Sequence, residues 1–299
     1  MSIKLGVIGL SEGNGHPYSW SAICNGYSPE HMNACDFPVI PQYLSKQSWP
    51  DARISGVEVT HIWTQDPELS RQVAKASLIS HVANKPEAMV GQIDALLLAR
   101  DDAVNHLAFA KPFLEAGIPV YIDKPIAMSL EGFAALYRLQ QYDGQIFSCS
   151  ALRYAKELML SETQRERIGP IRHLQATTPK SWEKYAVHII EPVMQIIGSS
   201  VEVLSSRPRT FAETGRAVSL GFDNGITADL AAFGSDCATP LSIRVHGERG
   251  WQDLIFKDSF SAFKAALSEF VEGIRTKTCR SPYEFNRRVV SIIESGLRK

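Results

Sequence analysis

A lysine followed directly by a proline is the clearest candidate for chemistry in this sequence. Lys124 comes after the apolar run from Pro119 to Ile122, which we expect to be the fourth strand of a parallel sheet, and Asp123 and Pro125 flank it. Side chains at the carboxyl ends of such strands point into the ligand crevice. An ammonium group there can hydrogen-bond a substrate hydroxyl and help it lose its proton as hydride leaves. The alternative is a surface lysine in a turn.

A glycine-rich loop follows the first apolar run, residues 3–10. Its glycines are Gly9, Gly13 and Gly15, in the spacing G-x-x-x-G-x-G rather than G-x-G-x-x-G. Glycines between a strand and a helix let the backbone approach a pyrophosphate, which also meets the positive end of the helix. An ordinary strand-to-helix turn would have the same composition. His16 either contacts a phosphate or caps the helix.

The end of the second expected strand, residues 57–64, should select between NAD and NADP. In NAD sites an acidic residue here binds the ribose 2′-hydroxyl. The most natural alignment puts Thr64 at that position, with Gln65 beside it. A hydroxyl and an amide tolerate a 2′-phosphate better than a carboxylate does, which favours NADP. A register shift of two residues would instead place Asp66 there and favour NAD.

The elements around these residues alternate between strands and helices in residues 1–148. Expected strands lie at 3–10, 57–64, 93–99 and 119–122, and expected helices lie at 67–78, 102–116 and 130–141. This order is typical of α/β proteins with a doubly wound parallel sheet, so we expect a dinucleotide-binding Rossmann domain. Residues 29–55 interrupt the pattern, with four prolines and little periodicity, and predict a long loop that is functional or partly disordered.

Residues 149–299 show successive strands instead, at 171–177, 201–206, 217–222, 227–233 and 241–245. Asp223-Asn224-Gly225 is a hairpin turn signal. Helices are expected at 185–197, 260–275 and 283–296. The pattern predicts a C-terminal α+β domain for substrate binding and oligomerisation, with a mostly antiparallel, open-faced sheet. Because such a face needs covering, we expect a homodimer or homotetramer.

Composition excludes several classes of function. The formal net charge of the 299 residues is −1, so no strong field attracts nucleic acid or an anionic membrane. No apolar run approaches the roughly 20 residues that span a bilayer. The five cysteines are scattered, which argues for reduced thiols in the cytoplasm and against disulfides or zinc. No His, Asp and Cys cluster has metal-ligand spacing, so we expect no metal.

The order of several motifs resembles the glucose-fructose oxidoreductase/inositol dehydrogenase/MocA (Gfo/Idh/MocA) family of oxidoreductases. The segment A-G-x-x-V-x-x-D-K-P-x-A around Lys124 is similar to the E-K-P motif of that family. Further similarities occur along most of the chain, with residues 29–55 as the main exception. They are the IDALLLA strand followed by Asn105-His106, Arg153-Tyr154, Ile168-Gly169, Val187-His188-Ile-Ile-Glu191, Phe222-Asp-Asn-Gly225 and Phe270-Val-Glu-Gly-Ile274.

The resemblance implies a role for single positions. Lys124 matches the lysine that contacts both nicotinamide and substrate, and His188 matches the acid/base or hydroxyl-anchoring histidine. Glu191 stands where the family often has aspartate and shares a helix face with His188, so these three residues are the catalytic candidates. Expected cofactor contacts are Gly9, Ser11, Gly13, Gly15, Thr64, Gln65, Leu98, Ala99, Arg100, His106, Asp123 and Lys124. Expected substrate contacts are Lys124, Arg153, Tyr154, Lys184, Tyr185 and His188.

The sequence departs from the family pattern at the acid/base position. Many family dehydrogenases carry an acidic residue four positions before the histidine, where this chain has Lys184; Tyr185 or Glu183 are the possible substitutes. Two hypotheses therefore remain. The first is an NAD(P)-dependent enzyme that transfers hydride to or from a carbinol carbon of a sugar, inositol or sugar derivative. The second is a non-catalytic ligand sensor or binding protein on the same fold.

Overall fold

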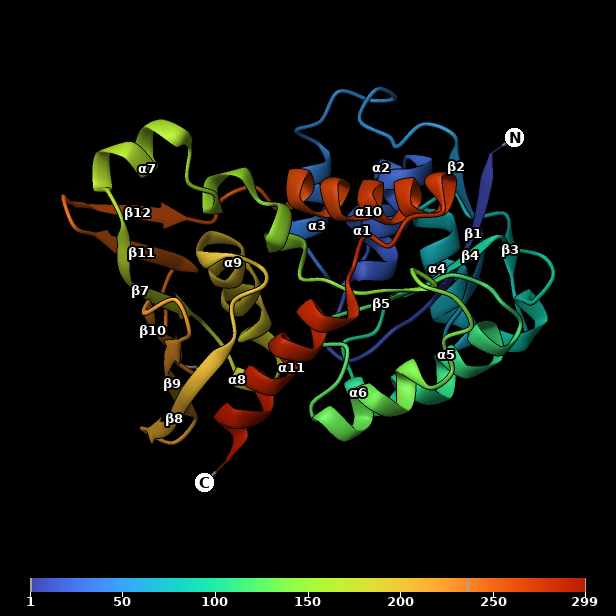
Figure 1. Ribbon diagram of the computed structural model, residues 1–299. Coiled ribbons are helices and arrows are strands. Elements are labelled where there is room, and N and C mark those ends of the chain that lie inside the picture. Colours follow the sequence, from blue (N-terminus) through green and yellow to red (C-terminus); the bar gives the residue numbers. More distant parts are fainter. Residues whose placement is uncertain (1, 236, 299) are drawn as a thin grey trace. The chain divides into compact units, whose positions relative to one another are not determined.

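The computed structural model of the chain describes residues 2–235 and 237–298 (Figure 1). The chain divides into two compact units that alternate along the sequence. The first unit contains residues 1–126, 134–148 and 267–281, and the second contains residues 127–133, 149–266 and 282–299. Each unit is built on its own six-stranded sheet.

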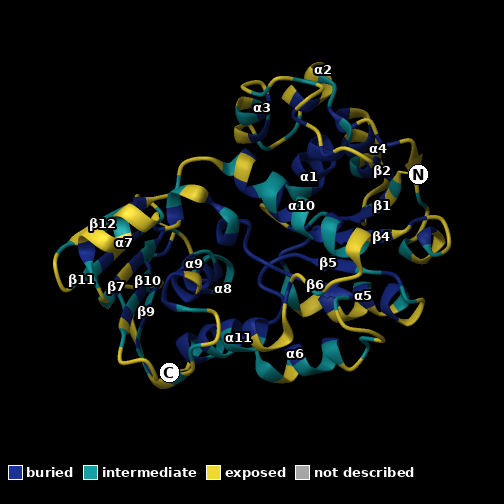
Figure 2. Cartoon of the chain, turned by 45° about the horizontal axis from the view of Figure 1, so that its top comes forward, coloured by how far each residue is buried: buried dark blue, intermediate teal, exposed yellow. Residues whose placement is uncertain are grey.

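The sheet of the first unit has the strand order β3-β2-β1-β4-β5-β6, and every pairing in it is parallel. This is the order of a Rossmann fold, and it confirms the predicted doubly wound sheet. The central strands are apolar on both faces because helices cover both (Figure 2). The strands are β1 (Ile3–Ile8), β2 (Val57–Trp63), β3 (His81–Val82), β4 (Ala95–Leu98), β5 (Val120–Ile122) and β6 (Ile146–Phe147).

Aromatic side chains attach two helices to the same face of this sheet. Trp20 stacks on Tyr121 with ring centroids 4.6 Å apart, and Phe270 meets the same tyrosine at 5.5 Å. A further helix packs on β4 and β5 and buries Phe113 and Leu114. Trp20 lies on α1 (His16–Asn25), Phe270 on α10 (Ser259–Thr276), and Phe113 and Leu114 on α5 (His106–Glu115). Two further helices that the sequence predicted are also present, α4 (Pro67–Ala76) and α6 (Leu130–Tyr137).

Residues 29–55 are not the irregular loop that the sequence predicted. They contain α2 (Pro29–Asn33) and α3 (Val39–Leu44), which bury Met32, Ile40 and Leu44. Pro29 occupies the first turn of α2, where a proline is tolerated because that N–H has no partner in the helix. Helices of five and six residues are too short to show a 3.6-residue repeat, which is why the pattern missed them.

The second unit contains a mixed sheet in the order β12-β11-β7-β10-β9-β8. Four of its pairings are antiparallel and one, between β7 and β10, is parallel. The predicted mostly antiparallel sheet is confirmed, including the hairpin at Asp223-Asn224-Gly225 between β9 and β10. The strands are β7 (Ile171–Thr178), β8 (Val203–Phe211), β9 (Gly215–Phe222), β10 (Thr227–Ala232), β11 (Ser242–Gly247) and β12 (Trp251–Ile255).

Helices cover the buried face of this second sheet. The expected helix at 185–197 is confirmed as α9 (Val187–Ile197), and the short helix α8 (Trp182–Tyr185) directly precedes it. Helix α9 packs on β7 and β11, and α11 (Tyr283–Leu297) packs on β8 and β9. The sequence pattern missed α7 (Glu162–Ile168) and strands β3, β6 and β12, all of seven residues or fewer. Over the described ranges, no helix combines the length and apolar character needed to cross a membrane.

Two turn glycines of the second sheet give a matched test of backbone strain. A Cβ added to Gly225 or to Gly250 would meet no atom within 4 Å, but only Gly225 has a left-handed φ, of +80°. We expect Gly225→Ala to lower the free energy of unfolding by about 1–2 kcal/mol, the cost of a left-handed L-residue. Gly250→Ala should change it little. Urea unfolding of both variants measures this, and equal effects would show that strain at Gly225 is not the cause.

Candidate functional site

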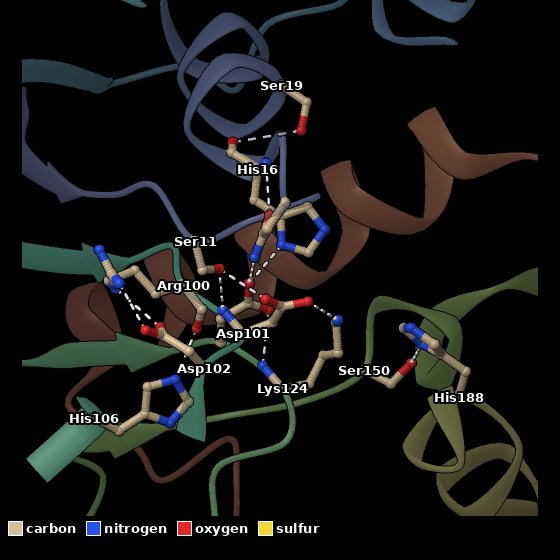
Figure 3. A network of polar contacts seen from close by, with 12 residues as sticks. Ser11, His16, Ser19, Arg100, Asp101, Asp102, His106, Lys124, Ser150 and His188 are labelled. Atoms are coloured by element: carbon tan, nitrogen blue, oxygen red, sulfur yellow. Dashed lines mark hydrogen bonds and ion pairs between the residues drawn. The ribbon is translucent and has the colours of Figure 1, made fainter. Parts of the chain in front are cut away.

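Polar side chains gather at the carboxyl ends of β1, β4 and β5 in the first unit. Ser11 donates a hydrogen bond from Oγ to Asp101 Oδ1 at 2.7 Å and accepts one from the Asp101 N–H at 3.0 Å. The Lys124 ammonium lies 3.5 Å from the other oxygen of Asp101 (Figure 3). All three residues are buried. Since β1 and β4 are neighbours where the strand order reverses, this contact lies at the topological switch point of the sheet, where ligands bind in such folds.

A second polar group surrounds the carboxylate of Asp123, which is completely buried. Its Oδ2 receives hydrogen bonds from Asn14 Nδ2 at 2.8 Å and from His16 Nδ1 at 2.6 Å, and its Oδ1 receives the Lys124 N–H at 2.7 Å. Burial alone would raise the pKa of Asp123, but His16, Lys124 and Asn14 outweigh it and hold that pKa well below its usual range. The carboxylate is therefore ionised and ties the glycine loop to the end of β5.

The glycine loop has room on one side and none on the other. Gly13 has a φ of +74°, and a Cβ there would meet nothing within 4 Å. A Cβ on Gly15 would lie 2.8 Å from Phe37 and 2.6 Å from Ile40, so residues of the 29–55 segment pack directly on the loop. Gly9 continues β1 by donating its N–H to Trp63 O. The loop is thus open to a ligand at Gly13.

The two residues expected to select the cofactor are placed differently. Thr64 is buried, and its hydroxyl is engaged with Asp66 O at 2.6 Å and Ser70 Oγ at 2.9 Å. Gln65 is exposed and bonds both the N–H and the C=O of Leu10. Its Oε1 also accepts from Arg100 Nη1 at 3.0 Å. Gln65, rather than Thr64, therefore presents a polar side chain beside the glycine loop.

Arg100 and His106 fix the loop that follows β4. Arg100 makes a two-point ion pair with Asp102, with N–O distances of 2.9 and 2.6 Å. His106 is completely buried, and its ring nitrogens lie 3.0 Å from Ile126 O and 2.7 Å from Arg100 O. It therefore joins the backbone after β4 to the backbone just past Lys124. Ala99, also buried, donates its N–H to Ile8 O.

In the second unit, His188 has a hydroxyl partner at Nδ1. Its Nδ1 lies 2.7 Å from Ser150 Oγ, and its ring meets Tyr185 edge-on at 5.1 Å. The Tyr185 hydroxyl accepts a hydrogen bond from Lys180 Nζ at 2.7 Å. Lys184 is half-buried on α8, and Glu183 lies 3.6 Å from Arg216. Among these contacts, the group that holds His188 is Ser150.

Glu191 lies inside the second unit as part of a buried ion pair. Its Oε2 receives hydrogen bonds from Arg153 Nε at 2.8 Å and from the Ser150 N–H at 2.9 Å. Burial alone would lower the pKa of Arg153, but the Glu191 carboxylate beside it raises that pKa above its usual range. Arg153 also reaches Asn286 and stacks on Phe285. Glu191 thus supports the segment that carries Ser150.

Tyr154 and Arg153 line a cavity of about 350 Å³ in the second unit, together with Met159, Arg165 and Pro192. Lys124 belongs to the first unit and His188 to the second, so their convergence on one substrate stays a prediction. Among residues 2–235 and 237–298, no three or more His, Cys, Asp or Glu side chains form a group that could hold a metal ion.

The sequence reasoning missed Asn14, Asp101 and Ser150, each of which holds one of the predicted residues. Asp101 had a usable signal, because it comes two residues after an expected strand, at the edge where ligands bind. Asn14 stands between two glycines of the loop. Ser150 carried no signal, since its role depends on a helix that begins 37 residues later.

A comparison with protein families finds one match. Residues 38–150 match the Gfo/Idh/MocA family model, described as an oxidoreductase family with an NAD-binding Rossmann fold. The match includes Gln65, Arg100 and Lys124 and begins after the glycine loop. It confirms the resemblance predicted from the sequence. No curated protein matches the chain.

Solved structures share the fold over nearly the whole chain. UDP-N-acetylglucosamine 3-dehydrogenase from Acidithiobacillus ferrooxidans is 16% identical, with a TM-score of 0.71 over 100% of both chains. The scyllo-inositol dehydrogenase of Lactobacillus casei is 14% identical, with a TM-score of 0.71 over 99% of this chain and 95% of that one. A myo-inositol dehydrogenase from Corynebacterium glutamicum is 13% identical, with a TM-score of 0.73 over 99% and 96%. At such identities the likeness is one of fold.

The Asp123 carboxylate gives a pH-dependent test of this site. Removing one partner of a buried charge pair costs about 3–5 kcal/mol, so we expect Asp123→Asn to destabilise the protein by about 3 kcal/mol at pH 7. Because the folded pKa lies below the unfolded value of about 4, the stabilisation is complete above about pH 5 and is lost as the pH falls through 4 towards the folded pKa. The difference between wild type and variant should therefore shrink between pH 5 and about pH 3.

Urea unfolding at several pH values measures this difference. Asp66→Asn is the matched control, because Asp66 caps α4 and asparagine caps a helix equally well. A penalty for Asp123→Asn that stays constant down to pH 3 would contradict an ionised, stabilising Asp123.

Proposed function

With residues 38–150 placed among the Gfo/Idh/MocA oxidoreductases, we propose that this chain is an NAD(P)-dependent enzyme. It transfers hydride to or from a carbinol carbon of a sugar, inositol or sugar derivative. The observation that carries the proposal is the position of Lys124, whose ammonium is held by Asp101 at the switch point of a Rossmann sheet. The sugar and inositol dehydrogenases that share the fold support this substrate class.

The described residues fit a dinucleotide at the carboxyl edge of the first sheet. The crevice between β1 and β4 is where such cofactors bind in sheets of this order. Gly13 offers an open backbone, and Leu98 and Ala99 end the strand beside it. His106 acts by positioning, since both its ring nitrogens already face carbonyl oxygens. When bound, the nicotinamide supplies the hydride acceptor or donor.

Lys124 holds the reacting oxygen of the substrate. Its ammonium donates a hydrogen bond to the carbinol oxygen and stabilises the negative charge that develops there as the proton leaves. Asp101 and Ser11 fix the ammonium in place, and the buried Asp123 fixes the backbone on which it is carried. The loop that carries Lys124 is thereby preorganised.

His188 is the proposed acid/base group that exchanges the proton of that oxygen. Ser150 orients its ring through Nδ1, so Nε2 is the nitrogen that faces substrate. Glu191 and Arg153 hold the Ser150 segment and act by positioning. Tyr154, Lys184 and Tyr185 are the proposed substrate contacts around the histidine.

We propose that residues 1–148 bind the cofactor and that residues 149–299 bind the substrate and form a homodimer or homotetramer. The open face of the second sheet carries polar pairs such as Arg244–Asp253 and His173–Asp229. Such a face can pair with a second copy through hydrogen bonds and charge complementarity. All five cysteines are free thiols, which supports the proposal that the protein functions in a reducing, cytoplasmic compartment.

One observation favours the alternative of a non-catalytic ligand sensor. Lys184 stands four positions before His188, where many dehydrogenases of the family carry an acidic residue, and the group at Nδ1 is the Ser150 hydroxyl, which stabilises an imidazolium less well than a carboxylate does. A sensor would bind NADH or NADPH but oxidise no polyol. Titration with both cofactors, followed by absorbance of the reduced nicotinamide with a panel of sugars, inositols and nucleotide sugars, separates the two functions.

Lys124→Ala tests the proposed mechanism directly. We expect the variant to stay folded and to lose at least about 10²-fold in kcat, the lower bound for removing one hydrogen-bond donor that stabilises a developing oxyanion. Lys111→Ala is the control, because Lys111 is exposed on α5 and pairs with Glu115 at 3.8 Å, on the same helix. Steady-state kinetics on the best substrate of the panel measures both variants. Full activity of Lys124→Ala would remove this residue from the mechanism.

Gln65→Glu tests the cofactor preference. We propose that NADP is favoured, because the amide of Gln65, with the Arg100 guanidinium beside it, stands where NAD sites carry an acidic residue. A carboxylate at residue 65 should weaken NADPH binding about tenfold relative to NADH. Gln175→Glu, on β7 of the second unit, adds the same charge and should leave the ratio of the two dissociation constants unchanged. An unchanged ratio in Gln65→Glu would rule out residue 65 as the selector.

A further inference from the structure

The imidazole of His16, in the glycine loop, is not used by the mechanism above. His16 Nδ1 lies 2.6 Å from the Asp123 carboxylate, with 17% of the histidine side chain and none of the aspartate side chain exposed. The two residues are 107 positions apart in the chain. A carboxylate partner fixes the tautomer and orientation of an imidazole, because Nδ1 must carry the proton that is shared.

The ring of His16 is also held on its face. It stacks on Trp20 with ring centroids 4.8 Å apart and an interplanar angle of 14°. Trp20 in turn stacks on Tyr121 of β5, which is buried. The imidazole therefore has one position, at the start of α1, with its Nε2 edge directed away from the aspartate (Figure 3).

The backbone donors that normally hold a phosphate at this helix start are already engaged. In Rossmann folds the free N–H groups at the start of the first helix bind the pyrophosphate. Here the His16 N–H donates to Asn14 Oδ1 at 2.8 Å, and Pro17 has no N–H. The next two N–H groups, of Tyr18 and Ser19, both donate to Gly15 O.

Beside the open backbone of Gly13, a pyrophosphate at the start of α1 therefore needs a side chain to bind it. Within residues 9–20, His16 is the only basic residue. We propose that His16, oriented by Asp123, grips the pyrophosphate of the dinucleotide through Nε2 and takes over the role of the helix N–H groups. This assignment rests on the proposed function, since it needs a dinucleotide in the switch-point crevice. It also gives the altered glycine spacing a purpose, because Asn14 accepts the His16 N–H and donates to Asp123 in the same loop.

Binding of pyrophosphate ligands by a His16→Gln variant tests the assignment. Glutamine keeps a polar side chain but cannot carry the charge, and charged hydrogen bonds are about twice as strong as neutral ones. We expect dissociation constants for NADH, NADPH and ADP-ribose to rise about tenfold or more, measured by calorimetry. His31→Gln, an exposed site on α2, should bind all three like the wild type. Thermal melting establishes that each variant is folded.

A measurement on the unaltered protein does not depend on the folding of a variant. Diethylpyrocarbonate modifies accessible imidazoles, and mass spectrometry locates the modified residues. ADP-ribose should protect His16 at least severalfold and leave His31 unprotected. Absence of protection, or wild-type affinity of His16→Gln for ADP-ribose, would overturn the assignment while leaving the oxidoreductase proposal standing. If the wild type binds none of NADH, NADPH and ADP-ribose, the proposed function itself fails.

Discussion

One buried carboxylate organises the cofactor side of this protein. Taking an ionised aspartate out of water costs several kcal/mol unless hydrogen bonds and opposite charge compensate. Asp123 obtains that compensation from His16, Asn14 and its own neighbour Lys124. Because these donors come from the loop after β1 and from the end of β5, the loop and the strand end cannot move apart without exposing an unpaired charge. The proposed lysine and the proposed phosphate-binding histidine are thus positioned by the same group.

The second unit follows the same principle with another acid. Glu191 is buried and receives hydrogen bonds from Arg153 and from the Ser150 N–H. Ser150 then orients His188 through its hydroxyl. In both units the residue proposed to meet the substrate stands next to the buried carboxylate, and the carboxylate itself serves to fix the backbone. For this reason we propose that Glu191, which was expected to be catalytic, positions the Ser150 segment.

The departures from the family pattern become coherent when these contacts are considered together. The glycine loop carries a histidine–carboxylate pair, His16 with Asp123. The lengthened loop carries Asn14, whose side chain accepts a hydrogen bond from the first N–H of α1 and donates one to Asp123. The 29–55 segment packs Phe37 and Ile40 against Gly15 and so fixes the loop from outside. Three features that looked separate along the chain meet at one end of one helix.

The sequence by itself determined the fold class and the order of the long strands and helices, and it put Lys124 forward as a candidate at the end of a parallel strand. These follow from local signals, because buried parallel strands are continuously apolar and residues at their carboxyl ends face the crevice. It did not determine the short elements such as α2, α3 and β3, because so few residues cannot show a repeating pattern of apolar side chains. Nor did it pair Asp123 with His16, Asp101 with Ser11, or Ser150 with His188. Those pairs join residues 38 to 107 positions apart, so only the folded sheet and its helices bring them within hydrogen-bond distance.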